Sequence, residues 1–237
     1  QLQDGEFVFK LTPIDGAKMP TDDNDVSLTE LTVTNDAEGK IIFDEISYSH
    51  EDDGATYRYK IVEVNGGETG MSYDPMEIFI DVAITDLLNG NLELVVTILD
   101  SDDPVADTVF NNSYEASGEW IPEVSKVLTA GGRDLLANEF NFKLTPVDNA
   151  TMPEDTDELL ASNDADGKVV FASIHYTEAD IGQTYYYEIV EVAGTEDGMT
   201  YDEMTITYKV VITDAGNGEL NVVYTVEGEE ADSEFNN

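Results

Sequence analysis

Alternating apolar and polar positions run through most of the sequence and predict β-strands. The alternating runs are rich in Val, Ile, Tyr, Thr and Phe and are bounded by Gly, Asn and Asp, as is typical of strands. No stretch keeps a helical period beyond a turn or two, and the acidic segments 20–35 and 153–165 are compatible with a loop or a short helix. The pattern therefore predicts an all-β protein. The expected strands are Phe7–Leu11, Lys40–Phe43, Tyr57–Val64, Glu77–Thr85, Asn91–Ile98, Thr108–Asn112, Phe140–Leu144, Lys168–Phe171, Tyr185–Val192, Thr205–Thr213, Glu219–Val226 and Ser233–Asn237.

The pattern occurs twice. GEFVFKLTPIDGAKMP opens the first copy and NEFNFKLTPVDNATMP the second, and TYRYKIVEV in the first matches TYYYEIVEV in the second. A repeat of this length is a domain and not a short solenoid unit. About seven short strands per copy favour two tandem immunoglobulin-like β-sandwiches. We expect the domains to span residues 1–116 and 117–237, with Tyr114–Trp120 as a short connector and Trp120 as a packing anchor at the junction.

The composition narrows the range of partners. Asp and Glu number 52 and Lys and Arg number 10 among the 237 residues, which gives a formal net charge of −42. Such a field repels nucleic acid and anionic membranes and favours a soluble monomer. Cysteine is absent, which excludes disulfides and thiolate metal sites. The sequence has no recognisable signal peptide or lipidation motif, and it begins and ends within repeat units, so we interpret it as a piece of a longer chain.

Each copy places a carboxylate on the apolar face of a predicted strand. Side chains alternate between the two faces of a strand, so Glu191 shares a face with Tyr187 and Ile189. Glu63 has the same position in the first copy. An unpaired, ionised carboxylate in a core would cost several kcal/mol, so each must be paired or neutral.

An amide and an amine lie on apolar faces as well. Asn112 and Asn237 end the closing strands of the two copies, each on the face of a preceding Phe. Lys126 lies between Val124 and Leu128 on one face of a run that precedes the second copy. Burial of a lone ammonium group lowers its pKa and favours the neutral amine.

These three groups can react with one another. A neutral amine is a nucleophile, a carboxamide is an acyl acceptor, and a protonated carboxylic acid can polarise the amide and transfer protons. In a dry pocket, attack of the Lys126 amine on the carbonyl of Asn237 would release ammonia and leave an isopeptide bond. The fold would accelerate this reaction by holding the three groups together.

Together, the segments SKVLTAGGRDL, YYYEIVEV and EFNN resemble the isopeptide linkage domains of Gram-positive pilins and sortase-anchored surface proteins, in particular the streptococcal T-antigen-like major pilins. The resemblance implies that Lys126 is the nucleophile, Glu191 the catalytic acid and base, and Asn237 the acceptor. It also implies a stalk or shaft segment outside the cell, anchored to the cell wall through the parent protein and flanked by neighbouring repeats.

The first copy departs from the family pattern because it has no matching lysine. It keeps the carboxylate, Glu63, and an acceptor, Asn112, within a closing Phe-x-Asn-x-Tyr pattern. The position that matches Lys126 would precede residue 1. We expect this domain to lack its first strand and Asn112 to be unpaired in this chain, with the parent protein supplying the lysine. The remaining lysines of this copy lie in loops, turns or outer faces: Lys10, Lys18, Lys40 and Lys60.

Several alternatives remain open. The Lys, Glu and Asn set could be a buried salt bridge with a hydrogen-bonded amide. The protein could be an adhesin module that binds a host glycan or protein through its loops. The first domain could accept a lysine-bearing strand from another molecule.

The remaining motifs do not indicate an enzyme, a metal site or a cofactor site. NDAEGK (35–40) and NDADGK (163–168) lack the ligand spacing of a calcium-binding EF-hand and favour Asp-Gly turns, although weak calcium binding by Asp22, Asp23 and Asp25 stays open. His50 and His175 have no partner at metal-ligand spacing. We therefore expect at most a single-turnover self-ligation.

Overall fold

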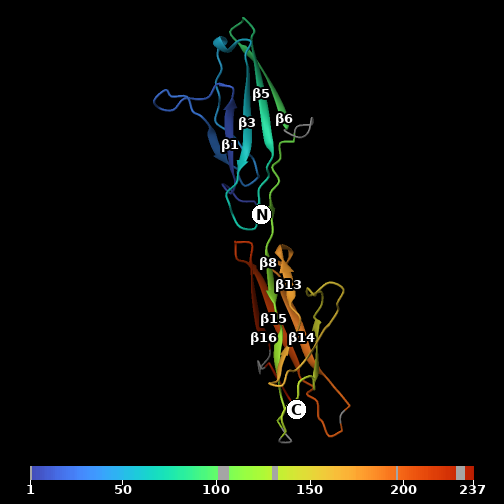
Figure 1. The fold of residues 1–237 in the computed structure, drawn as a ribbon. Coiled ribbons are helices and arrows are strands. Elements are labelled where there is room, and N and C mark those ends of the chain that lie inside the picture. The colour runs from blue at the N-terminus through green and yellow to red at the C-terminus, as the bar shows by residue number, and fades with distance from the viewer. Residues whose placement is uncertain (1, 101–106, 130–132, 196, 228–232) are drawn as a thin grey trace. The chain divides into compact units, whose positions relative to one another are not determined.

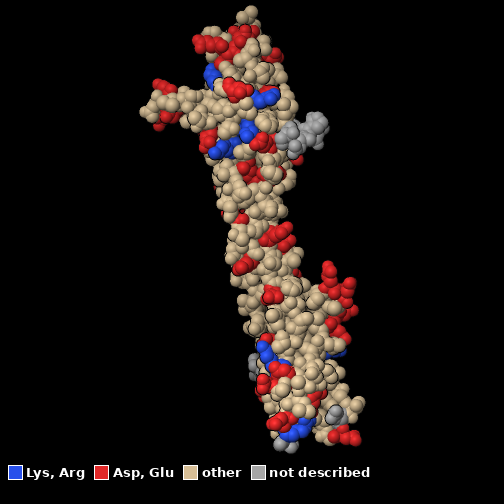
Figure 2. All heavy atoms as spheres, viewed as in Figure 1, with Lys and Arg blue, Asp and Glu red and all other residues tan. Residues whose placement is uncertain are grey.

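The computed structural model describes residues 2–100, 107–129, 133–195, 197–227 and 233–237, which are built almost entirely of strands (Figure 1). The chain divides into two compact units, Gln1–Ser113 and Tyr114–Asn237. These features confirm the all-β fold of two tandem immunoglobulin-like sandwiches. None of the helices in the described ranges is long and apolar enough to cross a membrane. Acidic side chains outnumber basic ones on the surface drawn in Figure 2, in keeping with the net charge.

The first unit contains a five-stranded antiparallel sheet in the order β2-β1-β3-β5-β6. Its central strand carries the TYRYKIVEV pattern, and its pairing with β1 places Glu63 opposite Phe9. The boundary between the two units falls within the short strand β7. The elements are β1 (Val8–Ile14), β2 (Leu31–Thr34), the 3₁₀ helix η1 (His50–Asp52), β3 (Thr56–Val64), β4 (Met71–Ser72), β5 (Glu77–Asp86), β6 (Leu92–Asp100) and β7 (Ser113–Tyr114).

The second unit repeats this sheet in the order β11-β10-β14-β15-β16 and adds two smaller sheets, β12-β9-β17 and β13-β8. Within the three-stranded sheet, β9 pairs antiparallel with β12 and parallel with β17. The elements are β8 (Ser117–Trp120), β9 (Glu123–Val127), β10 (Asn141–Pro146), β11 (Leu159–Ser162), β12 (Lys168–Val170), β13 (Ile174–Thr177), the 3₁₀ helix η2 (Glu178–Asp180), β14 (Thr184–Val192), β15 (Thr205–Asp214), β16 (Leu220–Glu227) and β17 (Glu234–Asn236).

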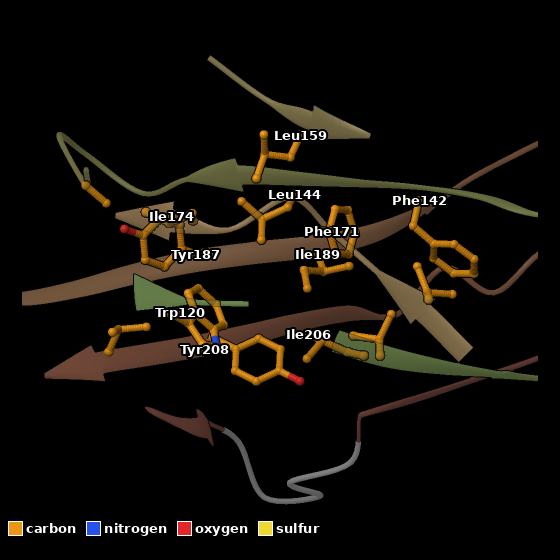
Figure 3. Close-up of a cluster of buried hydrophobic side chains, with 14 of the residues drawn as sticks. Trp120, Phe142, Leu144, Leu159, Phe171, Ile174, Tyr187, Ile189, Ile206 and Tyr208 are labelled. Atoms are coloured by element: carbon orange, nitrogen blue, oxygen red, sulfur yellow. The ribbon is translucent and has the colours of Figure 1, made fainter. Parts of the chain in front are cut away.

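The core of the second unit lies between the large sheet and the smaller ones (Figure 3). Tyr187 and Ile189 from β14 are fully buried in it, as are Val169 from β12 and Phe235 from β17. Trp120 from β8 packs against Tyr187 at a ring-centroid distance of 5.1 Å. Burial of aromatic and aliphatic side chains of this size dominates the stability of such a sandwich.

Two short segments differ from expectation. Acidic segments 20–35 and 153–165 begin as loops, as one of the two expected forms, but they also contain the edge strands β2 and β11, which are too short for their alternation to stand out from the surrounding turns. The connector Tyr114–Trp120 contains β8, which pairs with β13, and Trp120 is buried in the core of the second unit instead of at a junction. Gly and Ser in this segment suggested a linker, but the backbone of β8 is paired with a neighbouring strand.

Two expected strands of the first copy are also absent. Residues Lys40–Phe43 and Thr108–Asn112 form no continuous strand, although the matching segments of the second copy are β12 and β17. Both of those strands pair with β9. No strand in the described part of the first unit takes the place of β9, so the two segments lack the ladder that β9 provides, and Ile41 forms only an isolated bridge with Asn35.

Candidate functional site

The described residues of the second unit bring Glu191 into contact with both other candidate groups. Glu191 lies on β14 on the same face as Tyr187 and Ile189, as the alternation predicted, and β10 places Phe142 opposite it. Its side chain is fully buried. Because the side chain is buried in the sandwich, protein groups must form the hydrogen bonds of both carboxylate oxygens.

Lys126 enters the core from β9. The pattern of β9 buries Val124 and Lys126 and exposes Ser125, as predicted. The backbone N–H of Lys126 donates to the carbonyl of Gly167 at 2.7 Å. Gly167 has a φ of +87°, and a Cβ at this position would lie 2.2 Å from the carbonyl oxygen of Lys126. Only glycine therefore allows this turn to approach β9 so closely.

Asn237 follows directly after β17, whose residue Phe235 lies beside Lys126 in the parallel pair. The backbone N–H of Asn237 donates to Val127 at 3.0 Å, and its carbonyl accepts from the N–H of Thr129 at 2.6 Å. The ladder between β9 and β17 thus continues to Asn237. This pairing fixes the backbone of Asn237 beside the strand that carries the amine.

The carboxylate of Glu191 joins the other two groups. Lys126 Nζ lies 3.2 Å from Oε2 of Glu191, and Asn237 Nδ2 donates to Oε1 at 3.0 Å. The side-chain oxygen of Asn237 is buried and has no hydrogen-bond partner among the described residues. Burial lowers the pKa of Lys126, and attraction to Glu191 opposes part of that shift. The site therefore favours the neutral amine of Lys126 more than water does.

Two groups at the site were missed by the sequence analysis. The backbone N–H of Asp202 donates to Glu191 Oε2 at 2.9 Å, and the Asp202 carboxylate accepts from the N–H of Asn236 at 2.7 Å. Asp202 therefore links the carboxylate of Glu191 to the closing strand. Phe140 places its ring 4.8 Å from Lys126 Nζ. The signal for Asp202 was present, since GMSYDPM and GMTYDEM both contain the Tyr-Asp pair.

The first unit holds the same arrangement without the amine. Asn112 Nδ2 donates to Glu63 Oε1 at 2.6 Å, and the N–H of Asp74 donates to Glu63 Oε2 at 3.1 Å. The same Asp74 N–H also donates to the side-chain oxygen of Asn112 at 2.9 Å. Among the residues that the structure describes, no lysine or arginine forms an ion pair with Glu63. Lys10, Lys18 and Lys60 bond to Glu30, Asp52 and Glu77 instead.

The side chains of the acidic turns and of His175 form hydrogen bonds within their own segments. Asp36 and Asp164 each accept two backbone N–H groups within their own turns, as expected of Asp-Gly turns. Asp22 likewise caps its own loop by accepting from Asn24 and Val26. No group of three or more metal-ligating side chains occurs within the described ranges. His175 is exposed and lies near Ser173.

A protein-family comparison matches both halves of the chain. The family model for FctA, described as a Spy0128-like isopeptide containing domain, matches residues 1–115 and again residues 122–237. The chain belongs to this family. Its two FctA domains carry the carboxylate and amide pair twice and the lysine once, so the family resemblance inferred from the sequence is confirmed.

Solved structures similar to the chain are streptococcal pilins. The major pilin protein T3.2 from Streptococcus pyogenes shares 19% identity over 100% of this chain and 91% of its own, with a TM-score of 0.35. The T-13 major pilin shares 20% identity over 97% and 87%, with a TM-score of 0.33. A further S. pyogenes major pilin shares 18% identity over 97% and 88%, with a TM-score of 0.36. The chain matches no curated protein sequence.

Proposed function

We propose that this chain is a shaft segment of a Gram-positive surface protein or pilin, outside the cell and anchored through its parent protein. In this proposal its second domain is braced by an isopeptide bond between Lys126 and Asn237. The observation that carries the proposal is the buried set in which the two oxygens of Glu191 contact Lys126 and Asn237 separately.

The reaction balances without any other reactant. Glu191 takes a proton from the ammonium group, and the neutral Nζ attacks Cγ of Asn237. A bond forms between Nζ and Cγ, Glu191 passes its proton to Nδ2, and the bond between Cγ and Nδ2 breaks so that ammonia leaves. Glu191 then takes the second proton from Nζ, which leaves a neutral amide, and the departing ammonia carries that proton away as ammonium. The pKa of Lys126, lowered by burial, assists the first step. The fixed geometry of β9 and β17 replaces a bimolecular encounter.

The bond would act mainly under tension. β9 and β17 are parallel neighbours, so force applied to the two ends of the second domain would shear one strand against the other. A covalent link between Lys126 and Asn237 joins the strands at this point. Force would then pass through the link and leave the large sheet unloaded. The domain would serve as an inextensible element of a shaft.

Single-molecule pulling on the whole chain tests this role. The wild-type chain should show one unfolding extension, from the first domain, because the link prevents extension of the second. Asn237→Ala should add a second extension, whereas the matched variant Asn112→Ala should add none. Two extensions in the wild-type chain would refute the proposed brace.

A further inference from the structure

The amide oxygen of Asn237 is a buried acceptor to which none of the described residues donates a hydrogen bond. Attack of an amine on Cγ would move an electron pair of the carbonyl bond onto this oxygen and make it an oxyanion. Donors aimed at such an oxygen are usually the largest single contribution to acyl-transfer catalysis. Glu191 contacts the amide through Nδ2, on the side of the leaving group. The proposed reaction therefore needs another donor on the side of the oxygen.

The first domain shows which group can reach this oxygen. The N–H of Asp74 donates to Glu63 Oε2 at 3.1 Å and also to the side-chain oxygen of Asn112 at 2.9 Å. Asp202 is the matching residue of the second domain, and its N–H donates to Glu191 Oε2 at 2.9 Å. The N–H at this position thus contacts the carboxylate in both domains, and in the first domain it contacts the amide oxygen as well.

The loop that carries this N–H is held by its own carboxylate. The side chain of Asp202 accepts from the N–H of Met204 at 2.9 Å and from the N–H of Asn236 at 2.7 Å. Asp74 accepts from the two matching N–H groups at the same two distances. The described part of the first domain places no lysine at the site, so this loop geometry does not depend on the amine. A donor that is already in place needs little reorganisation during the reaction.

The residue before the N–H fixes the loop from its other side. A Cβ at Gly194 would lie 2.3 Å from the hydroxyl oxygen of Tyr201, so only glycine allows this close approach. Tyr201 also packs edge-on against Phe140, whose ring lies over the amine of the site. Gly66 and Tyr73 repeat the close approach in the first domain, at 2.6 Å.

We propose that the backbone N–H of Asp202 donates to the side-chain oxygen of Asn237 during the reaction and stabilises the negative charge that develops there. The inference rests on the proposed function, because it assigns a further group to the reaction between Lys126 and Asn237. The carboxylate of Asp202 has a positioning role, since it holds the N–H and the closing strand without touching the reacting atoms.

The N–H changes partner as the negative charge moves. Before attack it donates to Oε2 of Glu191. When Glu191 takes a proton from Lys126 and Nζ attacks Cγ, the negative charge moves to the oxygen of Asn237, and the N–H turns to that oxygen. Glu191 passes its proton to Nδ2, the electron pair on the oxygen re-forms the carbonyl bond, and the bond between Cγ and Nδ2 breaks to release ammonia.

A chain ligated from two pieces tests the N–H without changing any side chain. Residues 1–192 are produced recombinantly, residues 193–237 are synthesised, and the pieces are joined in denaturant through Ala193→Cys, which is then desulfurised to alanine. The synthetic piece carries either the native amide at residue 202 or an ester, in which an oxygen replaces the N–H. Only this piece contains Asn237, so the bond cannot form before the whole chain is diluted into buffer. Mass spectrometry then follows the loss of ammonia with time.

The native chain should lose about 17 Da, the mass of one ammonia released by acyl transfer. The ester at residue 202 should slow this loss by about 100-fold or more, the usual effect of removing one oxyanion donor. An ester at residue 203 is the matched control, because the first domain has Pro75 there and needs no N–H at that position. This control should react at the native rate. Asp202→Asn keeps the N–H and should react faster than the chain with the ester at residue 202.

The outcomes separate this inference from the proposed function. Loss of ammonia at the native rate in the chain with the ester at residue 202 would overturn only the inference, whereas a native chain that folds at full mass would refute both. The emission of Trp120, which is buried in the second domain, reports folding. If the ester chain does not fold, isotope labels on the nitrogen of residue 202 and on Cγ of Asn237 give a second test in the reacted native chain. A coupling across the hydrogen bond should join the two nuclei, and its absence would overturn the inference.

Discussion

The two domains share a sheet and a carboxylate–amide pair, but only the second has the strand that inserts a lysine between its sheets. Where β9 is present, β12 and β17 are strands, and Ile189 is fully buried. Where the described residues provide no such strand, the matching segments lose their ladders and Ile61 remains half-buried. One strand therefore completes the smaller sheet, closes the core and delivers the amine. The strand that completes the fold is therefore also the strand that brings Lys126 into contact with Glu191.

The largest expected difference between the domains comes from removal of the acceptor. Asn237→Ala should destabilise the second domain by roughly 4–5 kcal/mol, by analogy with a disulfide that closes a loop of about 100 residues. The matched change Asn112→Ala removes two side-chain hydrogen bonds, one to Glu63 and one from the Asp74 N–H, and should cost only about 1–2 kcal/mol.

Thermal unfolding can be followed separately for the second domain. Trp120 is the only tryptophan in the chain and is buried in that domain, so its emission reports the second transition alone. Circular dichroism follows both transitions. If Asn237→Ala and Asn112→Ala lost equal stability, the prediction that only the second domain is braced by a covalent bond would be contradicted.

A smaller effect is expected at the turn beside β9. Gly167→Ala and Gly39→Ala both place a side chain at positive φ, which costs about 1–2 kcal/mol. At Gly167 the new Cβ also meets the Lys126 carbonyl oxygen at 2.2 Å, whereas at Gly39 its nearest neighbour is the flexible end of Leu2 at 3.1 Å. Gly167→Ala should therefore lower the unfolding midpoint more and reduce bond formation. Similar losses at both glycines would show that close approach to β9 contributes little.

The smallest expected effect is on the loss of stability of the first domain at low pH. A hydrogen bond from Lys18 holds the pKa of Asp52 below its ordinary value, with further donors at Ser49 and Tyr57. Because the folded-state pKa is depressed, this contribution to stability is complete above the unfolded pKa of about 3.9 and is lost as pH falls through the folded pKa.

The second domain has Thr151 where the first has Lys18. Burial opposes ionisation of Asp180, and hydrogen bonds from Tyr185, Thr177 and Thr151 overcome that cost, so the pKa of Asp180 is also lowered. Lys18→Thr should raise the pKa of Asp52 and move its loss of stability to higher pH, without affecting Asp180. Carboxyl chemical shifts measured by NMR against pH check this. An unchanged Asp52 titration would show that Lys18 does not set its pKa.

The sequence predicted the sandwich and the faces of the candidate residues because strand alternation is a local property. Glu191 and Lys126 lie on the faces inferred from their neighbours, and the repeat located Glu63 and Asn112 in the same way. The resemblance to isopeptide domains then implied the roles that are proposed for these residues.

The remaining features depend on long-range pairing. Lys40–Phe43 has a strand pattern, but pairing with β9 makes its counterpart a strand, and alternation along one segment does not reveal a missing neighbour. The bond from the Asp202 N–H to Glu191 depends on a loop conformation that spacing does not specify. Trp120 was misplaced for the same reason, because its Gly- and Ser-containing segment pairs with β13.

Intact mass of the denatured chain tests the central claim most directly. We predict that the wild-type chain and Asn112→Ala each weigh about 17 Da less than their sequences require, because one ammonia is lost by acyl transfer. Asn237→Ala and Glu191→Gln should show the full mass of their sequences. A wild-type chain of full mass, or a deficit that survives in Asn237→Ala, would contradict the bond between Lys126 and Asn237.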